Sequence, residues 1–409
     1  MNMISMSRNN PIGEPIKIAK SKWLVPESQL DDQQRNFIEN VDIDKQNVWI
    51  KGFPGSGKSV LLAHTLRRIK NKNENARVAV VVFTRSLISM YRSAFAEMGM
   101  SAEIMTFYDF LNSTSSYEYV LSDEIQDMTE PVLNAMITHA NRVIVAGDEN
   151  QSIFECDPKY KEPTLLPSQI EEILNCRGSE VDLRIIHRLS RSIINAIQKF
   201  MPNLNLLEGK VDMTKKSTQI RLCSSRSSEE EKKYIMKEAE KAVNVGQTVA
   251  ILIPNGLAAI TFVNEVLKEK GKPQWNESKN QWGKPDFGNL NQHLQSHSVK
   301  LQYVGNGYGS FDNEDKICVM TYHSSKGLDF DNVFLPNLNK QLVVYKDEKL
   351  SKTLFMVAMT RSRNNLYLTY SGEMSDYLQS FSDDCNKIDI HSALLGKSSF
   401  GNSTNIFGF

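Results

Sequence analysis

The chain has 409 residues, 48 basic and 48 acidic side chains, and 40% hydrophobic residues. This length favours two or three domains over one, because single hydrophobic cores stop growing near ~250–300 residues. The composition excludes a collagen-like or mostly disordered chain. The charge balance excludes a binder that relies on bulk positive charge, as histones do, but it is compatible with a local basic groove.

The five cysteines lie far apart, and no pair has the CxxC spacing. Neither a zinc site nor a disulfide framework is therefore indicated, and free thiols in a reducing cytoplasm are the simplest interpretation. The sequence has no run of 18 apolar residues and no apolar stretch in its first twenty residues. We expect a cytoplasmic protein with no membrane association.

Strand-like runs alternate with helix-compatible segments in the first half of the chain. A short apolar run at 47–50 precedes a glycine-rich loop and a helix predicted over 60–70. The run RVAVVVFT at 77–84 is almost continuously β-branched, which is typical of a strand buried on both faces of a parallel sheet. With further runs at 117–121 and 142–147, the pattern predicts an α/β domain with a largely parallel sheet.

A second series of the same kind begins after about residue 215. Helices are predicted over 228–243 and 257–270, and a helical junction over 185–216. The strand-like runs of this series lie at 220–223, 248–254, 316–322, 332–336 and 365–370. The fold class we expect is therefore α/β, with two domains side by side. We place a leader at 1–29, the first domain at 30–200, the second at 201–395 and a mobile Ser/Asn/Gly-rich tail at 396–409.

The segment from Gly52 to Ser59, GFPGSGKS, satisfies the phosphate-loop pattern GxxxxGK[ST]. Backbone N–H groups around Gly52, Gly55, Ser56 and Gly57 would wrap phosphate oxygens, next to a helix N-terminus. Lys58 would reach the β- and γ-phosphates and Ser59 a Mg²⁺ ion. The alternative is a glycine-rich turn without a ligand, which the flanking strand and helix disfavour.

Two adjacent carboxylates, Asp123 and Glu124, follow the apolar run that ends at residue 121. In a phosphate-loop protein the first would hold Mg²⁺ and the second would polarise the attacking water. Gln151, shortly after another apolar run, is placed to contact a γ-phosphate. Arg188 and Arg361 are candidates for stabilising charge on a transferring phosphoryl group, with surface or salt-bridge arginines as the alternative.

Nine segments in order resemble the motifs of the UvrD/Rep/PcrA-like group of superfamily 1 helicases, and nine ordered matches are far more specific than one. The segments are LDDQQRNFI at 30–38, GFPGSGKS at 52–59, VVFTRSL at 81–87, TFYDFL at 106–111, LSDEIQD at 121–127, GDENQSIF at 147–154, LRIIHRLSRSI at 183–193, VMTYHSSKGLDFDNV at 319–333 and FMVAMTRSRNNLYL at 355–368. The resemblance implies two RecA-like domains with an ATP site in the cleft between them.

The resemblance also implies residue roles. Lys58, Ser59, Asp123 and Glu124 would bind and hydrolyse MgATP, and Gln151 would couple the γ-phosphate to the nucleic-acid groove. Arg188 and Arg361 would act as arginine fingers. Further nucleotide contacts are implied for Gln34, which would read adenine, His187, which would stack on it, Gly327 and Asp329. Single-strand contacts are implied for Thr84, Thr106, Phe107, Phe154, Thr321 and His323, where aromatic rings suit base stacking.

The sequence departs from the family at several points. Asp329 stands where the family usually has Glu, and His187 stands where it has Tyr. Only 16 residues separate Thr106 from Asp123, too few for the accessory domain that larger relatives carry there. About 40 residues, near 273–315, remain for the other accessory domain.

The segment 273–315 is rich in Asn, Gln, Gly and Ser, and it contains Trp275 and Trp282. It is either an accessory element that touches nucleic acid or a partner through these tryptophans, or a surface excursion whose aromatic side chains pack on the second domain. We favour the second interpretation slightly.

Two functional hypotheses follow. The first is an ATP-driven translocase on single-stranded DNA, with RNA not excluded, that moves 3′ to 5′ by resemblance and unwinds duplex in its helicase form. The second is a nucleic-acid-triggered ATPase switch that regulates a protein partner such as a nuclease, for instance in phage defence. A metabolic phosphoryl transferase is disfavoured by the duplicated α/β set and the two arginines.

Overall fold

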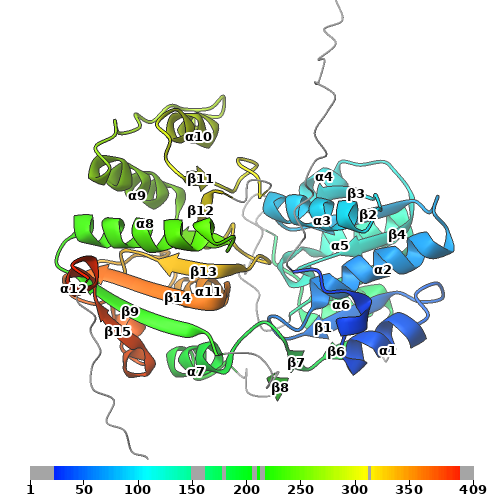
Figure 1. The fold of residues 1–409 in the computed structure, drawn as a ribbon. Helices are drawn as coiled ribbons and strands as arrows, with labels where there is room; N and C mark the ends of the chain where they lie inside the picture. The colour runs from blue at the N-terminus through cyan, green and yellow to red at the C-terminus, as the bar shows by residue number, and fades with distance from the viewer. Residues whose placement is uncertain are drawn as a thin grey trace, which may run out of the picture.

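The computed structural model describes residues 23–148, 162–176, 181–204, 210–211, 217–311 and 315–396. These residues form two α/β lobes that lie side by side (Figure 1). Most of the predicted leader, the predicted tail from residue 397, and the site candidates Gln151 and Phe154 lie outside the described residues.

The first lobe is built on a six-stranded parallel sheet in the order β3-β2-β4-β5-β1-β6. Its strands are β1 (Val48–Gly52), β2 (Val78–Val82), β3 (Glu103–Thr106), β4 (Tyr117–Ser122), β5 (Ala140–Gly147) and β6 (Val181–Leu183). The fully buried β2 confirms the prediction from the β-branched run, since alternate valines of this strand enter hydrophobic clusters on opposite faces of the sheet.

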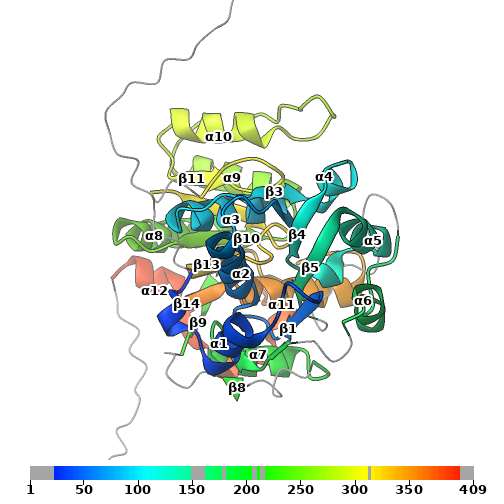
Figure 2. The ribbon, with the colours of Figure 1, turned by 90° about the vertical axis from the view of Figure 1, so that its right-hand side faces the viewer.

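Helices cover both faces of this sheet. On one face lie α1 (Asp32–Asn40), α2 (Lys58–Lys72) and α3 (Arg85–Glu97), and on the other lie α4 (Phe107–Leu111), α5 (Glu130–His139) and α6 (Pro167–Leu174). Short 3₁₀ turns η1 (Glu27–Gln29) and η2 (Ile125–Asp127) precede α1 and follow β4. Figure 2 views the molecule with this lobe in front.

The second lobe carries a seven-stranded parallel sheet in the order β11-β12-β10-β13-β14-β9-β15. Its strands are β9 (Gln219–Ser225), β10 (Val249–Ile253), β11 (Leu301–Tyr303), β12 (Ile317–Thr321), β13 (Phe330–Leu335), β14 (Ser362–Ser371) and β15 (Asn386–Asp389). Two parallel sheets in one chain confirm the predicted fold class, and they have the layered arrangement of two RecA-like domains.

The second sheet is also covered on both faces. One face holds α8 (Ser228–Asn244), α9 (Gly256–Glu269), α10 (Phe287–Ser296) and α12 (Ile390–Leu394), and the other holds α7 (Arg191–Phe200) and α11 (Glu348–Met359). The 3₁₀ turns η4 (Asp376–Leu378) and η5 (Ser382–Asp384) follow β14. None of the helices in the described ranges is long and apolar enough to cross a bilayer.

The chain passes between the lobes just before α7. A small parallel pair, β7 (Ile185–Ile186) with β8 (Lys210–Val211), lies at this crossing. Helix α7 then packs on the second lobe, where the Phe200 ring meets the edge of Phe355 at 5.3 Å between centroids. We therefore propose a domain boundary ahead of α7 rather than at residue 200.

The segment 273–315 contributes to the second lobe rather than forming a separate unit. It supplies α10 and the edge strand β11, and Phe287 stacks on Tyr303 at 3.7 Å between ring centroids. Trp275 is buried and its Nε1–H donates to Asn289 Oδ1 at 2.8 Å, whereas Trp282 is exposed. This packing favours the second of the two interpretations of the segment, with Trp282 as the exception.

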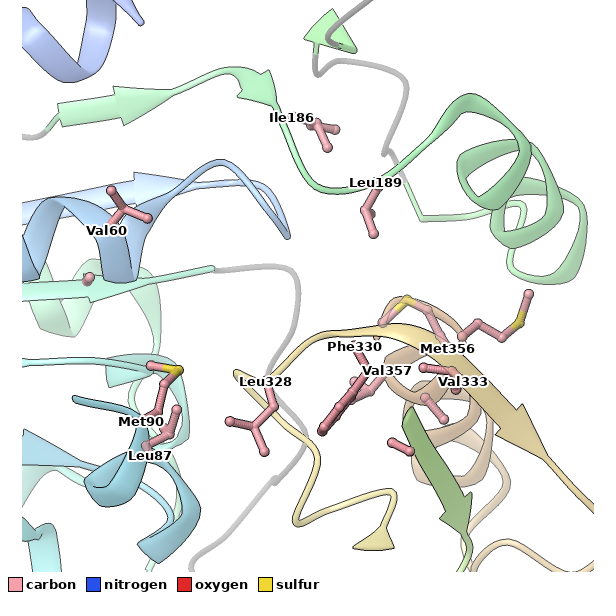
Figure 3. Close-up of a cluster of buried hydrophobic side chains, with 14 of the residues drawn as sticks. Val60, Leu87, Met90, Ile186, Leu189, Leu328, Phe330, Val333, Met356 and Val357 are labelled. Carbon is pink, nitrogen blue, oxygen red and sulfur yellow. The ribbon is translucent and has the colours of Figure 1, made fainter. Parts of the chain in front are cut away.

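The two lobes meet through apolar side chains as well as through polar ones. Leu328, on a loop of the second lobe, points toward Leu87 and Met90 of α3 (Figure 3). Gly327 beside it approaches so closely that a Cβ there would lie 2.6 Å from Leu87 Cδ2. The loop after β12 therefore packs directly on the first lobe and borders the cleft between the lobes.

Candidate active site

A cavity of about 390 Å³ lies between the lobes at the carboxyl ends of their parallel strands, where α/β sheets usually hold ligands. The structure brings twelve of the predicted site residues to its wall. They are Gln34, Gly55, Gly57, Lys58, Ser59, Asp123, Glu124, His187, Arg188, Gly327, Asp329 and Arg361. Gly52 and Ser56 belong to the same segment but are not among the residues that line the cavity.

At two positions of the phosphate loop the backbone conformation requires glycine. Gly55 and Gly57 have φ of 75° and 89°, in the left-handed region that favours glycine. A Cβ on Gly55 would lie 2.5 Å from Arg188 Cβ, and one on Gly57 would lie 2.4 Å from Gln34 Nε2. The loop therefore depends on close approach to two other motifs, and α2 begins immediately after it with the dipole end toward the cavity.

Lys58 is folded onto its own loop. Its Nζ donates to Gly52 O at 2.8 Å and to Phe53 O at 3.0 Å, and the side chain is buried. Burial lowers the pKa of Lys58, and the carboxylates of Asp148, Glu124 and Asp123 oppose that shift. A buried cation held only by carbonyls and nearby carboxylates is suited to binding an anion.

Asp123 is fixed by two hydroxyl donors. Ser59 Oγ and Tyr91 OH donate to the same oxygen, Asp123 Oδ2, at 2.6 and 2.7 Å. Burial and the neighbouring Glu124 raise the pKa of Asp123, and these two hydrogen bonds oppose the shift. Among the described residues no group of three or more His, Cys, Asp or Glu side chains could hold a metal. One carboxylate beside one hydroxyl does fit Mg²⁺, which takes few protein ligands and completes its shell with phosphates and water.

Glu124 is held in an unusual backbone conformation at the end of β4. Its φ and ψ are 58° and 42°, and Gln126 Nε2 donates to Glu124 Oε2 at 2.6 Å. Burial raises the pKa of Glu124, but the ammonium groups of Lys326 and Lys58 outweigh it and bring the pKa to about 2. The carboxylate is therefore ionised at neutral pH, as a water-polarising base must be.

Lys326 joins the lobes electrostatically. Its Nζ, on the loop after β12, pairs with Asp127 and lies 3.5 Å from Glu124 Oε2, and both Lys326 and Asp127 are buried. Burial lowers the pKa of Lys326, yet the carboxylates of Asp127 and Glu124 raise it overall. The second lobe thus contacts the catalytic candidate Glu124 directly.

Removing this ammonium should destabilise the protein. Lys326→Met leaves Asp127 buried without its cation, and breaking a buried pair costs about 3–5 kcal/mol. We expect the apparent melting temperature, followed by circular dichroism, to fall by about 5 °C or more. Lys340→Met is the control, because Lys340 makes an exposed pair with Asp376 that should contribute little. Equal melting temperatures for the two variants would contradict the assignment.

Arg188 and Arg361 face the cavity from the lobe crossing and from the end of α11. Arg361 is buried, and its guanidinium donates to Val357 O at 2.8 Å and to Leu328 O at 3.1 Å. Burial and the positive charge of Arg188 lower the pKa of Arg361, and burial lowers that of Arg188. Two guanidinium groups that repel each other across a cavity favour an anion between them, and the role of this pair in stabilising a phosphoryl group stays a prediction.

Asp329, the predicted ribose contact, lines the cavity but is paired with Arg363 of β14. Burial raises the pKa of Asp329, and the guanidiniums of Arg363, Arg188 and Arg361 lower it overall. The carboxylate is thus engaged by the second lobe's own arginine. A ribose contact by Asp329 stays a prediction.

The adenine-reading candidates lie together at the N-terminus of α1. Gln34 forms a capping box with Asp31, and its Nε2 donates to Ser56 O at 2.9 Å. His187 Nε2 lies 2.5 Å from Asp31 Oδ2, and the His187 and Arg188 N–H groups both donate to Gly55 O. The segments 30–38 and 183–193 are therefore each hydrogen-bonded to the phosphate loop, and they are also hydrogen-bonded to each other.

The first-lobe candidates for nucleic-acid contact lie at strand ends. Thr84 and Thr106 follow β2 and end β3, and their side chains cap α3 and α4. Phe107 is buried and stacks on Phe83 at 5.4 Å between centroids, with Tyr108 at 4.0 Å. Because the Phe107 ring is covered in this structure, a base contact here would fall first to the half-buried Phe83 and Tyr108.

Of the second-lobe candidates, Thr321 ends β12 and His323 lies on the loop that follows. Thr321 Oγ1 donates to Ser324 Oγ at 3.0 Å, and the His323 ring lies 6.2 Å from that of Tyr345. Burial and Lys326 lower the pKa of His323 to about 4, so it is neutral at pH 7. Tyr345 and Val343 beside it are exposed. A neutral imidazole next to an exposed phenol is suited to stacking, and the nucleic-acid role of these residues stays a prediction.

Sequence reasoning missed four residues of the cavity region. Tyr91, Lys326 and Arg363 contact Asp123, Glu124 and Asp329, and Trp23 lines the cavity from the predicted leader. Lys326 and Arg363 do lie inside the helicase-like segments at 319–333 and 355–368, but their partners are on other elements. Their function depends on how the elements pack, which spacing alone does not reveal.

Two family models match the chain. One, described as the UvrD-like helicase C-terminal domain, matches residues 276–373, and one described as an AAA domain matches residues 34–157. The two matches support the resemblance of this chain to the UvrD-like superfamily 1 helicases. The matches fall on the two lobes whose cleft holds the cavity, as expected for a helicase of this family with a nucleotide-binding phosphate-loop domain.

Solved structures similar to this UvrD-like chain include three helicase structures. The Arterivirus nonstructural protein 10 helicase is 14% identical with a TM-score of 0.37, covering 82% of this chain and 61% of that one. The same helicase in complex with DNA is 14% identical with a TM-score of 0.36, covering 86% and 64%. The PRRSV helicase is 14% identical with a TM-score of 0.39, covering 83% and 54%. This chain thus spans less than two thirds of each of those chains, and no curated protein sequence matches it.

Proposed function

We propose that this UvrD-like protein hydrolyses ATP to ADP and phosphate to drive movement along single-stranded DNA. One observation carries the proposal. Three cations from three separate elements, the buried Lys58 and Arg361 and the half-buried Arg188, converge with the carboxylates Asp123 and Glu124 on one cavity between two parallel-sheet lobes. Positive charge fixed around an anion and a carboxylate poised beside it are what phosphoryl transfer to water requires.

The residues of the cavity divide the chemistry between them. Lys58 and the phosphate-loop N–H groups would bind the phosphates, and Ser59 with Asp123 would hold Mg²⁺, which neutralises phosphate charge. Glu124 would orient and deprotonate the attacking water. Arg188 and Arg361 would stabilise the charge that develops on the equatorial oxygens. Gln151 remains a candidate for sensing the γ-phosphate.

Movement would come from opening and closing of the cleft. Lys326 binds Glu124 and Asp127 directly, so charge changes at the nucleotide would reach the loop that carries His323 and begins directly after Thr321. Thr84, Thr106, Thr321 and His323, with rings such as Phe83, supply the proposed strand contacts, and Phe107 and Phe154 remain candidates. By resemblance the direction is 3′ to 5′.

The test is ATP hydrolysis with and without single strands. We expect phosphate release to rise at least tenfold with a DNA oligomer, and streptavidin to be displaced faster from a biotinylated 5′ end than from a 3′ end. RNA oligomers of the same sequence measure the preference between nucleic acids. Absence of hydrolysis in the presence of every oligomer would contradict the proposal.

A second candidate is the ATPase switch that regulates a partner such as a nuclease. The short connection from Thr106 to Asp123 favours it, because the described residues there form only α4, a loop and β4. The described part of the chain therefore shows no added domain for engaging duplex at this position. Strand-stimulated hydrolysis without streptavidin displacement from either end would support the switch over the translocase.

A further inference from the structure

The wall of the cavity is both charged and apolar. Lys58, Asp123, Glu124, Arg188 and Arg361 supply its charged groups. The side chains of Trp23, Val25, Val60 and Met90 also line the cavity and carry no charge. A ligand that fills the whole space therefore needs a highly charged part and an apolar part.

Trp23 is held in place by the elements around it. Its ring meets the edge of Tyr91 at 5.6 Å between centroids with an interplanar angle of 78°. Two residues later, Val25 O accepts a hydrogen bond from His64 Nε2 at 2.9 Å, and Leu30 is buried. The segment that leads into α1 therefore contacts α2 through Val25 and α3 through Trp23, and the indole of Trp23 lines the cavity.

A nucleoside triphosphate matches this mixed lining. The phosphate loop and the charged side chains suit the triphosphate, which leaves the apolar side chains for the base and ribose. Among the described residues that line the cavity, Trp23 and His187 carry aromatic rings, and His187 is hydrogen-bonded to Asp31. An indole offers a larger stacking surface than an imidazole.

We propose that Trp23 binds the nucleobase of the nucleotide by packing its indole against it. This inference rests on the proposed function, since it assumes a nucleoside triphosphate in the cavity. It assigns a binding role to the segment ahead of α1, which the sequence motifs leave without one. Because base–aromatic stacking tolerates any base, Trp23 contributes affinity and leaves base selection to polar groups.

The experiment compares two ligands by isothermal titration calorimetry in the presence of Mg²⁺. ATP carries a base, and inorganic tripolyphosphate carries the charge without one. Trp23→Leu should weaken ATP binding roughly tenfold and leave tripolyphosphate binding unchanged. Trp23→Phe should recover most of the ATP affinity, because it restores an aromatic ring.

Trp282→Leu is the matched control, because Trp282 is exposed on the second lobe and does not line the cavity. Equal loss of ATP and tripolyphosphate affinity in Trp23→Leu would overturn the proposal, since Trp23 would then act through Tyr91 and Asp123. Unchanged ATP affinity would overturn it as well. Failure of the unmodified protein to bind either ligand would instead refute the proposed function.

Discussion

Lys58→Ala should reduce ATP hydrolysis by more than about 10³-fold and leave binding of a single-stranded oligomer measurable. Lys58 is the buried ammonium of the phosphate loop, and its Nζ now donates to the carbonyls of Gly52 and Phe53. When phosphates enter, this ammonium is the closest loop cation available to them. The proposed strand contacts lie on other loops, so we do not expect them to depend on Lys58.

The measurement is phosphate release under saturating DNA, with oligomer binding followed by fluorescence anisotropy. Lys58→Met removes the charge but retains an aliphatic side chain, so it shows whether the loss of activity comes from the charge or from lost packing. Lys51→Ala is the control, since Lys51 precedes the loop and pairs with Glu171 at 2.6 Å. Hydrolysis by Lys58→Ala at the rate of the unmodified protein would mean that GFPGSGKS is not the phosphate site.

Arg361→Ala should lower kcat roughly 10³-fold with a modest effect on ATP binding. The guanidinium of Arg361 comes from the second lobe and is pinned by Val357 O and Leu328 O, so its charge is fixed before the reaction begins. Fixed charge stabilises the transition state more than the bound substrate. Loss of kcat with retained affinity is the kinetic signature of that role.

Arg361→Lys separates charge from geometry, and we expect it to recover only a small part of kcat because an ammonium cannot reproduce the fork of a guanidinium. Arg184→Ala serves as the control, because Arg184 is exposed and pairs with Asp182. Melting temperatures show whether the variants fold. An unchanged turnover number in a folded Arg361→Ala protein would reduce this residue to a structural role.

Buried strands were the most predictable part of the fold. Continuous β-branched runs such as those of β2 and β10 are unambiguous because both faces of each strand are covered. Edge strands β3 and β15 are short and partly exposed, so their hydrophobic pattern is too weak to recognise. Helix α10 is not predicted from the sequence, because its Asn and Gln residues resemble those of a loop. Phe287, Leu290 and Leu294 nevertheless give this helix one buried face.

The site was predictable where its chemistry is contiguous in the sequence. The phosphate loop and the Asp123–Glu124 pair are local motifs, and the structure places both at the cavity. The bonds of Tyr91 to Asp123 and of Lys326 to Asp127 join residues 32 and 199 positions apart. Pairs of this kind are set by the packing of α3 and of the loop after β12, and a single sequence carries no spacing signal for them.

The hydrogen bonds at Gly55 have a mechanical consequence. One carbonyl of the phosphate loop accepts the N–H groups of His187 and Arg188, at 2.9 and 3.0 Å, and the chain enters α7 of the other lobe within a few residues. The connection between the lobes is therefore hydrogen-bonded to the phosphate loop at its start. We expect a displacement of the phosphate loop to move the N-terminus of α7, and with it the second lobe.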